Sequence, residues 1–174
     1  NILAVSVIED TTVEVTWENN TANDLGAYLL SRYDPVTLSY QLAYTDNNPM
    51  PIGTAPVTVY QDIGLDTRNN SYTYMLQAAD RCDYRTPVSL LTAHTTINVT
   101  ATTAGTSIDV NWNRYSGCSV SRYDITRTEI ITGNTQVVAS VPAGTNFFTD
   151  TTLFCPFDYS YRITAFDLCG NAYT

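Results

Sequence analysis

Few residues in this 174-residue chain could carry covalent or metal chemistry, and their types exclude several reactions. His94 is the one histidine, and all eight basic side chains are arginine, so the sequence contains no lysine. Walker phosphate-binding loops, protein kinases and Schiff-base enzymes all need a lysine. Zinc sites with two histidine ligands are excluded because the second histidine is missing.

The candidate nucleophiles are four cysteines at positions 82, 118, 155 and 169. None of them forms a C-x-x-C pair, so a zinc ribbon is not expected. Cys82 with His94 is the one thiol–imidazole pairing on offer, but a lone histidine in a linker is usually solvated. No serine lies in a nucleophile elbow, and the carboxylates show no clustering typical of glycosidases. We therefore expect a protein that is not an enzyme and needs no cofactor.

Calcium is the one metal for which the sequence offers ligands. The segment 18–26 is rich in Asn and includes Asp24, and Asp80 and Asp83 could approach it at the same end of the fold. Carboxylate and amide oxygens are what this hard cation prefers. However, no EF-hand spacing is present, and Asn and Asp are ordinary turn formers. The sequence supports a weak calcium site or a plain turn.

The charge of the chain is strongly lopsided. There are 17 acidic against 8 basic side chains, a net charge of −9. Nucleic acids and anionic membranes are unsuitable partners because both need a basic surface. No apolar run approaches the roughly 18 residues that direct membrane insertion needs. The first residues do not resemble a signal peptide, so we expect a mature or excised segment, or a cytosolic chain. Abundant Thr, Asn, Tyr and Asp favour an extracellular, cell-surface location.

The elements that position these residues come from an internal repeat, the first thing to look for in a sequence. Three segments of the first half recur in the same order in the second half. They are 13–17 with 108–112, 28–32 with 123–127, and 72–82 with 159–169. We therefore predict two copies of one module, 1–94 and 95–174, joined by a short linker around 93–96.

Each recurring segment alternates apolar and polar residues. Val13, Val15 and Trp17 point one way and the residues between them point the other, which indicates a half-buried strand. Turn-forming clusters separate such segments, and no stretch has helical periodicity. About seven short strands per copy is typical of an antiparallel β-sandwich. The expected fold class is all-β.

The repeated residues resemble the fibronectin type III family. The resemblance rests on the tryptophan of the second predicted strand, the tyrosine opening the third, and a Leu…Tyr-x-Tyr-x-[Leu/Ile]-x-Ala run later in each copy. It implies two tandem fibronectin type III or immunoglobulin-like sandwiches with Trp17 and Trp112 in their cores. It also implies that Tyr72 and Tyr159 form tyrosine corners, with each hydroxyl bonded back to the preceding loop.

A narrower likeness lies in the second copy. Asp167-Leu-Cys169-Gly-Asn, together with Cys118, resembles modules of large Bacteroidetes cell-surface and gliding-associated proteins exported by type IX secretion. In this fold the loops that carry Cys118 and Cys169 lie at the same end, which makes the pair a disulfide candidate. Cys82 and Cys155 have no obvious partner.

Two Asp-Thr-Thr motifs resemble the O-glycosylation acceptor pattern of Bacteroidetes envelope proteins. They occur at 10–12 and 150–152, so the candidate acceptors are Thr11 and Thr151. The resemblance implies surface decoration at both threonines.

The two copies end differently. The first continues after Cys82 into 86–93, which we expect to form the seventh strand, whereas few residues follow Cys169. We therefore expect the second module to be C-terminally incomplete, without its last strand. Either the sequence is an excerpt of a longer chain, or a neighbouring subunit donates the missing strand.

The sequence contains no set of residues that indicates a reaction. We expect a structural or adhesive segment of an extracellular multi-module bacterial surface protein or filament, acting in spacing, assembly and contact. Its partners would be neighbouring modules or subunits and a glycan or other cell-surface ligand. The alternative is that the chain consists of accessory modules of a secreted enzyme, or of ligand-binding modules of such an enzyme. Ligand-binding modules of this kind would bind a carbohydrate or would depend on calcium.

Overall fold

The computed structural model describes residues 1–20, 22–47, 57–154, 157–167 and 172–174. They form two compact units, unit 1 at Asn1–Thr96 and unit 2 at Ile97–Thr174. In the described residues the regular elements are strands, apart from one 3₁₀ turn at Val88–Leu90. No helix among them is long and apolar enough to cross a membrane.

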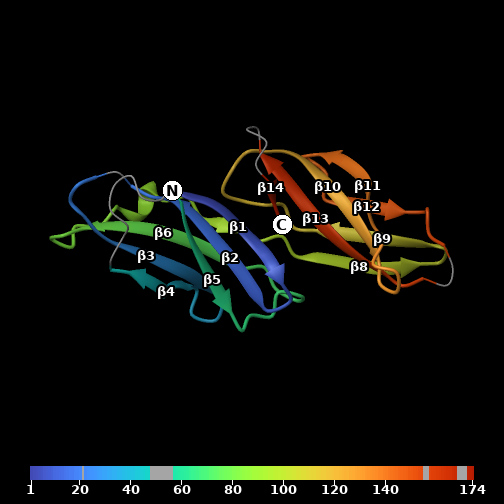
Figure 1. Ribbon diagram of the computed structural model, residues 1–174, viewed down its shortest axis with the longest axis horizontal. Coiled ribbons are helices and arrows are strands. Elements are labelled where there is room, and N and C mark those ends of the chain that lie inside the picture. The colour runs from blue at the N-terminus through green and yellow to red at the C-terminus, as the bar shows by residue number, and fades with distance from the viewer. Residues whose placement is uncertain (21, 48–56, 155–156, 168–171) are drawn as a thin grey trace. The chain divides into compact units, whose positions relative to one another are not determined.

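Unit 1 consists of two antiparallel sheets (Figure 1). The first has the order β1-β2-β5, from Ile2–Glu9, Thr12–Glu18 and Val57–Ile63. The second has the order β4-β3-β6-β7, from Ser39–Asp46, Leu25–Asp34, Thr73–Asp80 and His94–Thr95.

Unit 2 repeats this strand order. Its first sheet is β12-β9-β8, from Phe147–Asp150, Ser107–Trp112 and Val99–Ala104. Its second is β11-β10-β13-β14, from Thr135–Pro142, Val120–Glu129, Tyr159–Asp167 and Ala172–Tyr173. The prediction of an all-β chain with two antiparallel sandwiches is confirmed.

The core of each unit lies between its two sheets. Val13, Val15 and Trp17 of β2 are fully buried, as their period of two requires. Trp17 meets Tyr28 edge-on with ring centroids 5.9 Å apart. In unit 2, Trp112 and Tyr123 meet in the same way at 5.8 Å. Such aromatic pairs contribute about 0.5–1.5 kcal/mol beyond the area they bury.

The last strand of unit 1 differs from the prediction. Residues 86–93 do not form it, because after Thr86 the chain leaves β6 at Pro87, the N-cap of the 3₁₀ turn Val88–Leu90. The chain returns to the sheet only at β7, where His94 pairs with Tyr74. The apolar residues of this segment had suggested a strand, but Val88 and Leu90 are exposed.

The last strand of unit 2 needs the opposite correction. We expected none, yet Ala172 and Tyr173 form the two-residue β14 and pair with Phe166 and Ala165 of β13. Tyr173 is only 3% exposed. Its ring stacks on Tyr115 at 4.7 Å, and its hydroxyl donates a hydrogen bond to the Asp167 carboxylate at 2.8 Å. These contacts stabilise a strand of only two residues. Whether the module is complete stays a prediction.

Although Tyr173 belongs to a strand of only two residues, we expect its side chain to stabilise unit 2. Tyr173→Phe should lower the free energy of unfolding by about 1 kcal/mol through the lost hydrogen bond. Tyr173→Ala should lower it by about 3 kcal/mol through the cavity it leaves. Urea unfolding followed by tryptophan fluorescence measures both.

The matched control is Tyr84→Ala, since the Tyr84 side chain is 77% exposed. It should change stability by less than about 0.5 kcal/mol. Equal stability of the Tyr173→Ala and Tyr84→Ala variants would show that β14 does not contribute.

Candidate functional site

The most polar part of the core in unit 2 is an arginine–aspartate–tyrosine cluster. Arg127 Nη1 donates a hydrogen bond to Asp150 Oδ2 at 2.7 Å and further bonds to Thr152 at 3.1 Å. Tyr161 donates its hydroxyl proton to the same Asp150 oxygen at 2.9 Å. The side chains of Arg127 and Asp150 are only 2% and 1% exposed. This ion pair is therefore fully enclosed.

Unit 1 contains the same cluster. Arg32 Nη1 lies 2.5 Å from Asp62 Oδ2, and the Tyr74 hydroxyl donates to that oxygen at 2.8 Å. The side chains of Arg32 and Asp62 are 36% and 9% exposed, so solvent reaches the guanidinium here. The internal repeat therefore extends to a buried charge pair.

Local sequence explains the placement. Arg32 follows Tyr28 and Leu30 at every second position of β3, which turns it toward the core. Asp150 ends β12, and its Oδ1 accepts hydrogen bonds from the backbone N–H and hydroxyl of Thr152. The Arg127 guanidinium also lies over the Tyr159 ring, 4.8 Å from its centroid.

The electrostatics of the cluster make it inert. Burial raises the pKa of Asp150, but hydrogen bonds from Thr152, Arg127 and Tyr161 outweigh burial, so this pKa lies below its usual 3.8. Burial and the neighbouring carboxylate raise the pKa of Tyr161 above its usual 10. At neutral pH the carboxylate is ionised and the phenol is protonated. Because the pair is enclosed, we assign it a structural role.

The predicted core hallmarks lie at the two ends of each sandwich. Trp17 and Trp112 are buried. The Tyr72 hydroxyl accepts a hydrogen bond from the Asp66 N–H at 2.9 Å. The Tyr159 hydroxyl accepts one from the Phe154 N–H at 2.9 Å. Both hydroxyls thus bind the loop that precedes their own strand.

Two of the three calcium candidates, Asp80 and Asp83, make other side-chain contacts. Asp80 Oδ1 accepts hydrogen bonds from the N–H groups of Cys82 and Tyr84 at 2.8 and 2.9 Å. Asp83 pairs with Arg85 at 2.9 Å. For Asp24 the structure shows its backbone carbonyl accepting from Arg81. In the described ranges, no three His, Cys, Asp or Glu side chains are grouped to hold a metal ion. The calcium site stays a prediction.

Cys82 does not form a nucleophilic site with His94. Cys82 follows the end of β6 at Asp80, whereas His94 pairs with Tyr74 near the start of that strand. Neither Cys82 nor Cys118 forms a disulfide with another described residue, and burial raises the pKa of Cys118. Cys155 and Cys169 lie outside the described residues, so the Cys118–Cys169 disulfide stays a prediction.

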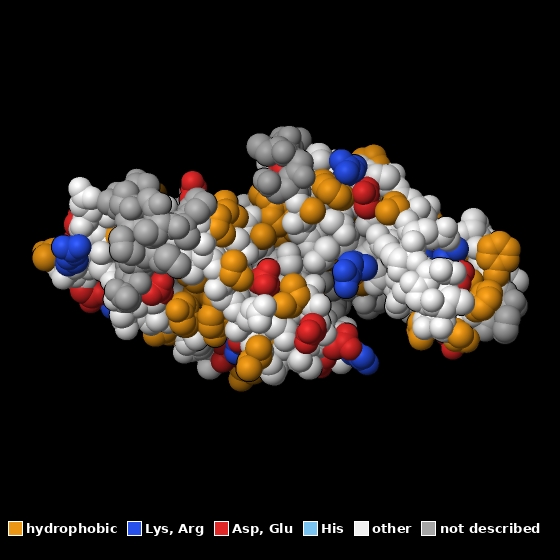
Figure 2. Space-filling view, viewed as in Figure 1, with side chains coloured by type: hydrophobic (Ala, Val, Ile, Leu, Met, Phe, Trp, Pro, Cys, Tyr) orange, Lys and Arg blue, Asp and Glu red, His pale blue; other side chains and the backbone are white. Residues whose placement is uncertain are grey.

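His94 is not solvated, as we had expected for a linker histidine, but only 4% exposed. It belongs to β7 rather than to a linker, and burial lowers its pKa to about 4. The glycosylation candidates Thr11 and Thr151 are both exposed. Acidic and basic side chains are scattered over each unit on the face shown in Figure 2.

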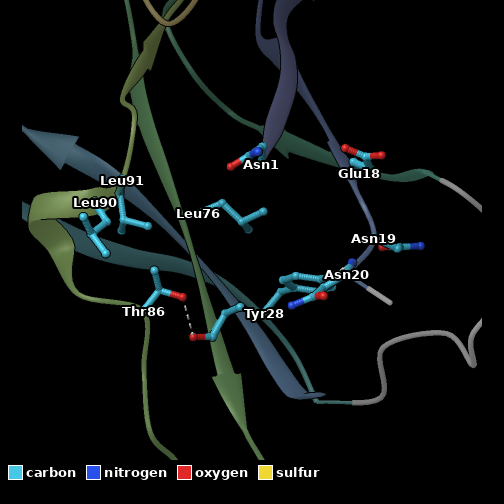
Figure 3. Close-up of a pocket in the computed structure, with 10 residues that line it drawn as sticks. Asn1, Glu18, Asn19, Asn20, Tyr28, Leu76, Thr86, Leu90 and Leu91 are labelled. Carbon is cyan, nitrogen blue, oxygen red and sulfur yellow. Dashed lines mark hydrogen bonds between the residues drawn. The ribbon is translucent and has the colours of Figure 1, made fainter. Parts of the chain in front are cut away.

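Unit 1 also holds a pocket of about 400 Å³ (Figure 3). It opens between the ends of β1 and β2 on one side and β6 with the 86–91 segment on the other. Its lining consists of Asn1, Glu18, Asn19, Asn20, Tyr28, Leu76, Ala78, Thr86, Leu90 and Leu91. The sequence did not predict this pocket, because 86–93 were expected to form a strand.

Comparison with known proteins gave no matching family model and no matching curated sequence. Among solved structures, the chain is similar to a two-domain fibronectin type III segment of chicken tenascin, with 18% identity, 100% of this chain and 93% of that chain covered, and a TM-score of 0.37. It is also similar to domains FN1–FN3 of chicken CNTN1, with 17% identity, 97% and 63% coverage and a TM-score of 0.37. For domains A168–A170 of titin the values are 15% identity, 98% and 58% coverage and a TM-score of 0.39.

These likenesses concern the fold alone: the chain consists of two antiparallel β-sandwich domains.

Removing Asp150 should be costly, because Arg127 would stay buried without its partner. We expect Asp150→Ala to lower the free energy of unfolding by about 3–5 kcal/mol. Asp62→Ala should cost only about 1 kcal/mol, because Arg32 can turn to water. Urea unfolding of the two variants compares them directly.

A double variant distinguishes the cost of losing the ion pair from the cost of leaving Arg127 buried without its partner. Arg127→Met with Asp150→Leu removes both charges and should recover most of the loss. If Asp150→Ala were no more costly than Asp62→Ala, the enclosed pair would not be the stronger constraint.

His94 should make the chain less stable in mild acid. The unfolded histidine has a pKa of about 6.5, and the folded one about 4. Between these values the unfolded state binds more protons, so stability falls as the pH drops. The total loss is roughly 3 kcal/mol. His94→Gln should lack this component, whereas the carboxylates titrate in both proteins. The free energy of unfolding is measured with urea at several pH values for both proteins. An equal decrease of this free energy from pH 7 to pH 4 in the unmodified chain and in His94→Gln would contradict the prediction.

Proposed function

We propose that the chain is a structural and adhesive segment of an extracellular multi-module surface protein. Its work is to space, assemble and make contacts. The observation that carries this proposal is the Arg–Asp–Tyr cluster, which recurs in both units and ties together the sheets of each one. These polar residues stabilise the packing of the two sheets. The fold alone does not assign a reaction.

Several observations support export to a cell surface. The net charge of −9 is distributed over the surface apart from the Asp62 and Asp150 pairs, which suits a solvated outer coat. Thr11 and Thr151 are accessible for glycosylation. The Asp-x-Cys-Gly-Asn motif and its likeness to proteins exported by type IX secretion in Bacteroidetes belong to the same proposal.

The partners we propose are neighbouring modules or subunits. In unit 1, β7 pairs with Thr73 and Tyr74 of β6. In unit 2, β14 covers only Ala165 and Phe166, near the other end of β13. A strand from a following module or from another subunit would pair with the remaining edge of β13. Edge strands are the usual sites of such β-augmentation.

The proposal is tested on cells that produce the protein. An antibody raised against the purified chain should label intact cells, and brief protease treatment should remove the label. Cells that express the chain without a route for export serve as the control. Labelling that needs permeabilised cells would overturn the surface location, and turnover of any substrate by the purified chain would overturn the non-catalytic role.

A further inference from the structure

The edge of β6 in unit 1 is interrupted. Arg85 pairs with Ala79 near one end of the strand, and His94 pairs with Tyr74 near the other. These two registers do not match, because the intervening chain is longer than the stretch of β6 beside it. The carbonyl of Thr86 accepts a hydrogen bond from Gln77 Nε2 at 2.6 Å, which stops the ladder there.

The backbone of Leu76 faces this gap. The carbonyls of Tyr72 and Ala78 accept hydrogen bonds from Thr96 and Thr86, so these even-numbered residues turn their backbone polar groups toward the last strand. Because these orientations alternate along an antiparallel strand, the N–H and C=O of Leu76 point the same way. No strand residue lies opposite Leu76 on that side. Leu76, which lines the pocket and is only 8% exposed, therefore has an N–H and a C=O directed toward that side of β6.

The walls of the pocket differ in character (Figure 3). Leu76, Leu90 and Leu91 provide an apolar side, and Glu18, Asn19 and Asn20 provide a polar rim across from it. A smaller pocket of about 160 Å³ shares the lining residues Asn20, Ala78 and Thr86 and adds Asp24 and Asp80. The two pockets thus continue along β6, with carboxylates as the charged side chains of their lining.

We infer that this pocket binds an extended peptide segment of a basic partner protein by β-augmentation beside Leu76. One residue of the partner would donate its N–H to the Leu76 C=O and accept the Leu76 N–H with its own C=O. The side chain opposite Leu76 would pack against Leu90 and Leu91. Two residues further along, on the same face, a lysine or arginine would reach Glu18. The chain's net charge of −9 attracts such a partner. This inference deepens the proposed role in contact and rests on it.

The test uses the full chain and a defined probe, the peptide acetyl-Thr-Leu-Thr-Lys-Thr-amide. Titration followed by ¹⁵N–¹H NMR should shift the Leu76 amide signal at millimolar or lower peptide concentration. Replacing the peptide leucine by serine should weaken binding about ten-fold. Replacing its lysine by glutamate should weaken it at least three-fold.

Protein variants assign the binding to this pocket. Glu18→Gln should weaken binding of the lysine peptide about three-fold and leave binding of the glutamate peptide no weaker. The matched control is Glu9→Gln, an equal charge change at an exposed residue outside both pockets. An unmoved Leu76 signal, or equal weakening by both variants, would overturn the inference.

The outcome is separable from that of the proposed function. If antibody labels intact cells but no peptide binds, the pocket holds only water and the inference fails while the surface role stands. If the peptide binds but labelling needs permeabilised cells, the surface location fails while the peptide site stands.

Discussion

The interaction that both sandwiches share is an arginine–aspartate ion pair between their two sheets, which is enclosed in unit 2 and partly reached by solvent in unit 1. In unit 2, Arg127 and Tyr161 belong to one sheet, and Asp150 belongs to the other. In unit 1, Arg32 lies in one sheet and Asp62 in the other. Apolar contacts are non-directional and tolerate sliding of one sheet over another. A short ion pair is directional and fixes the register between the sheets, since its separation would leave a charge in the core.

This constraint also explains why a chain without lysine retains arginine at these two positions. The Arg127 guanidinium donates to Asp150 and Thr152 while its planar face covers the Tyr159 ring. A lysine ammonium is a compact point charge and could not make these contacts together. At the other end, Trp112 meets Tyr123, whose hydroxyl accepts from the Tyr115 N–H at 3.1 Å. The two sheets are therefore tied near both ends of the sandwich by contacts of fixed geometry.

The sequence was sufficient to predict the fold, because period-two alternation and the internal repeat both follow from burying one face of each strand. It did not lead to the two arginine–aspartate pairs. Arg32 and Arg127 stand in inward register in both copies, and each aspartate precedes a leucine by three residues, so the repeat held the signal for the buried pair. His94 gave no such signal, because its burial depends on the long-range pairing of β7 with β6. The pocket could not be predicted either, since it arises from a register mismatch that no local pattern encodes.

The last strands of the two modules differ in how they pair with the preceding strand. In unit 1, the chain leaves β6 after Thr86, and a pocket lined by Leu76 lies beside the segment that loops out. In unit 2, the position where the ladder would begin holds Tyr173, which is anchored on Tyr115 and Asp167. An anchored strand end adds stability, and an interrupted one adds a place where a new backbone can pair. Since both copies keep the same inter-sheet ties, the edge is free to vary without endangering the core. Differences in contact between such modules are therefore expected at this edge.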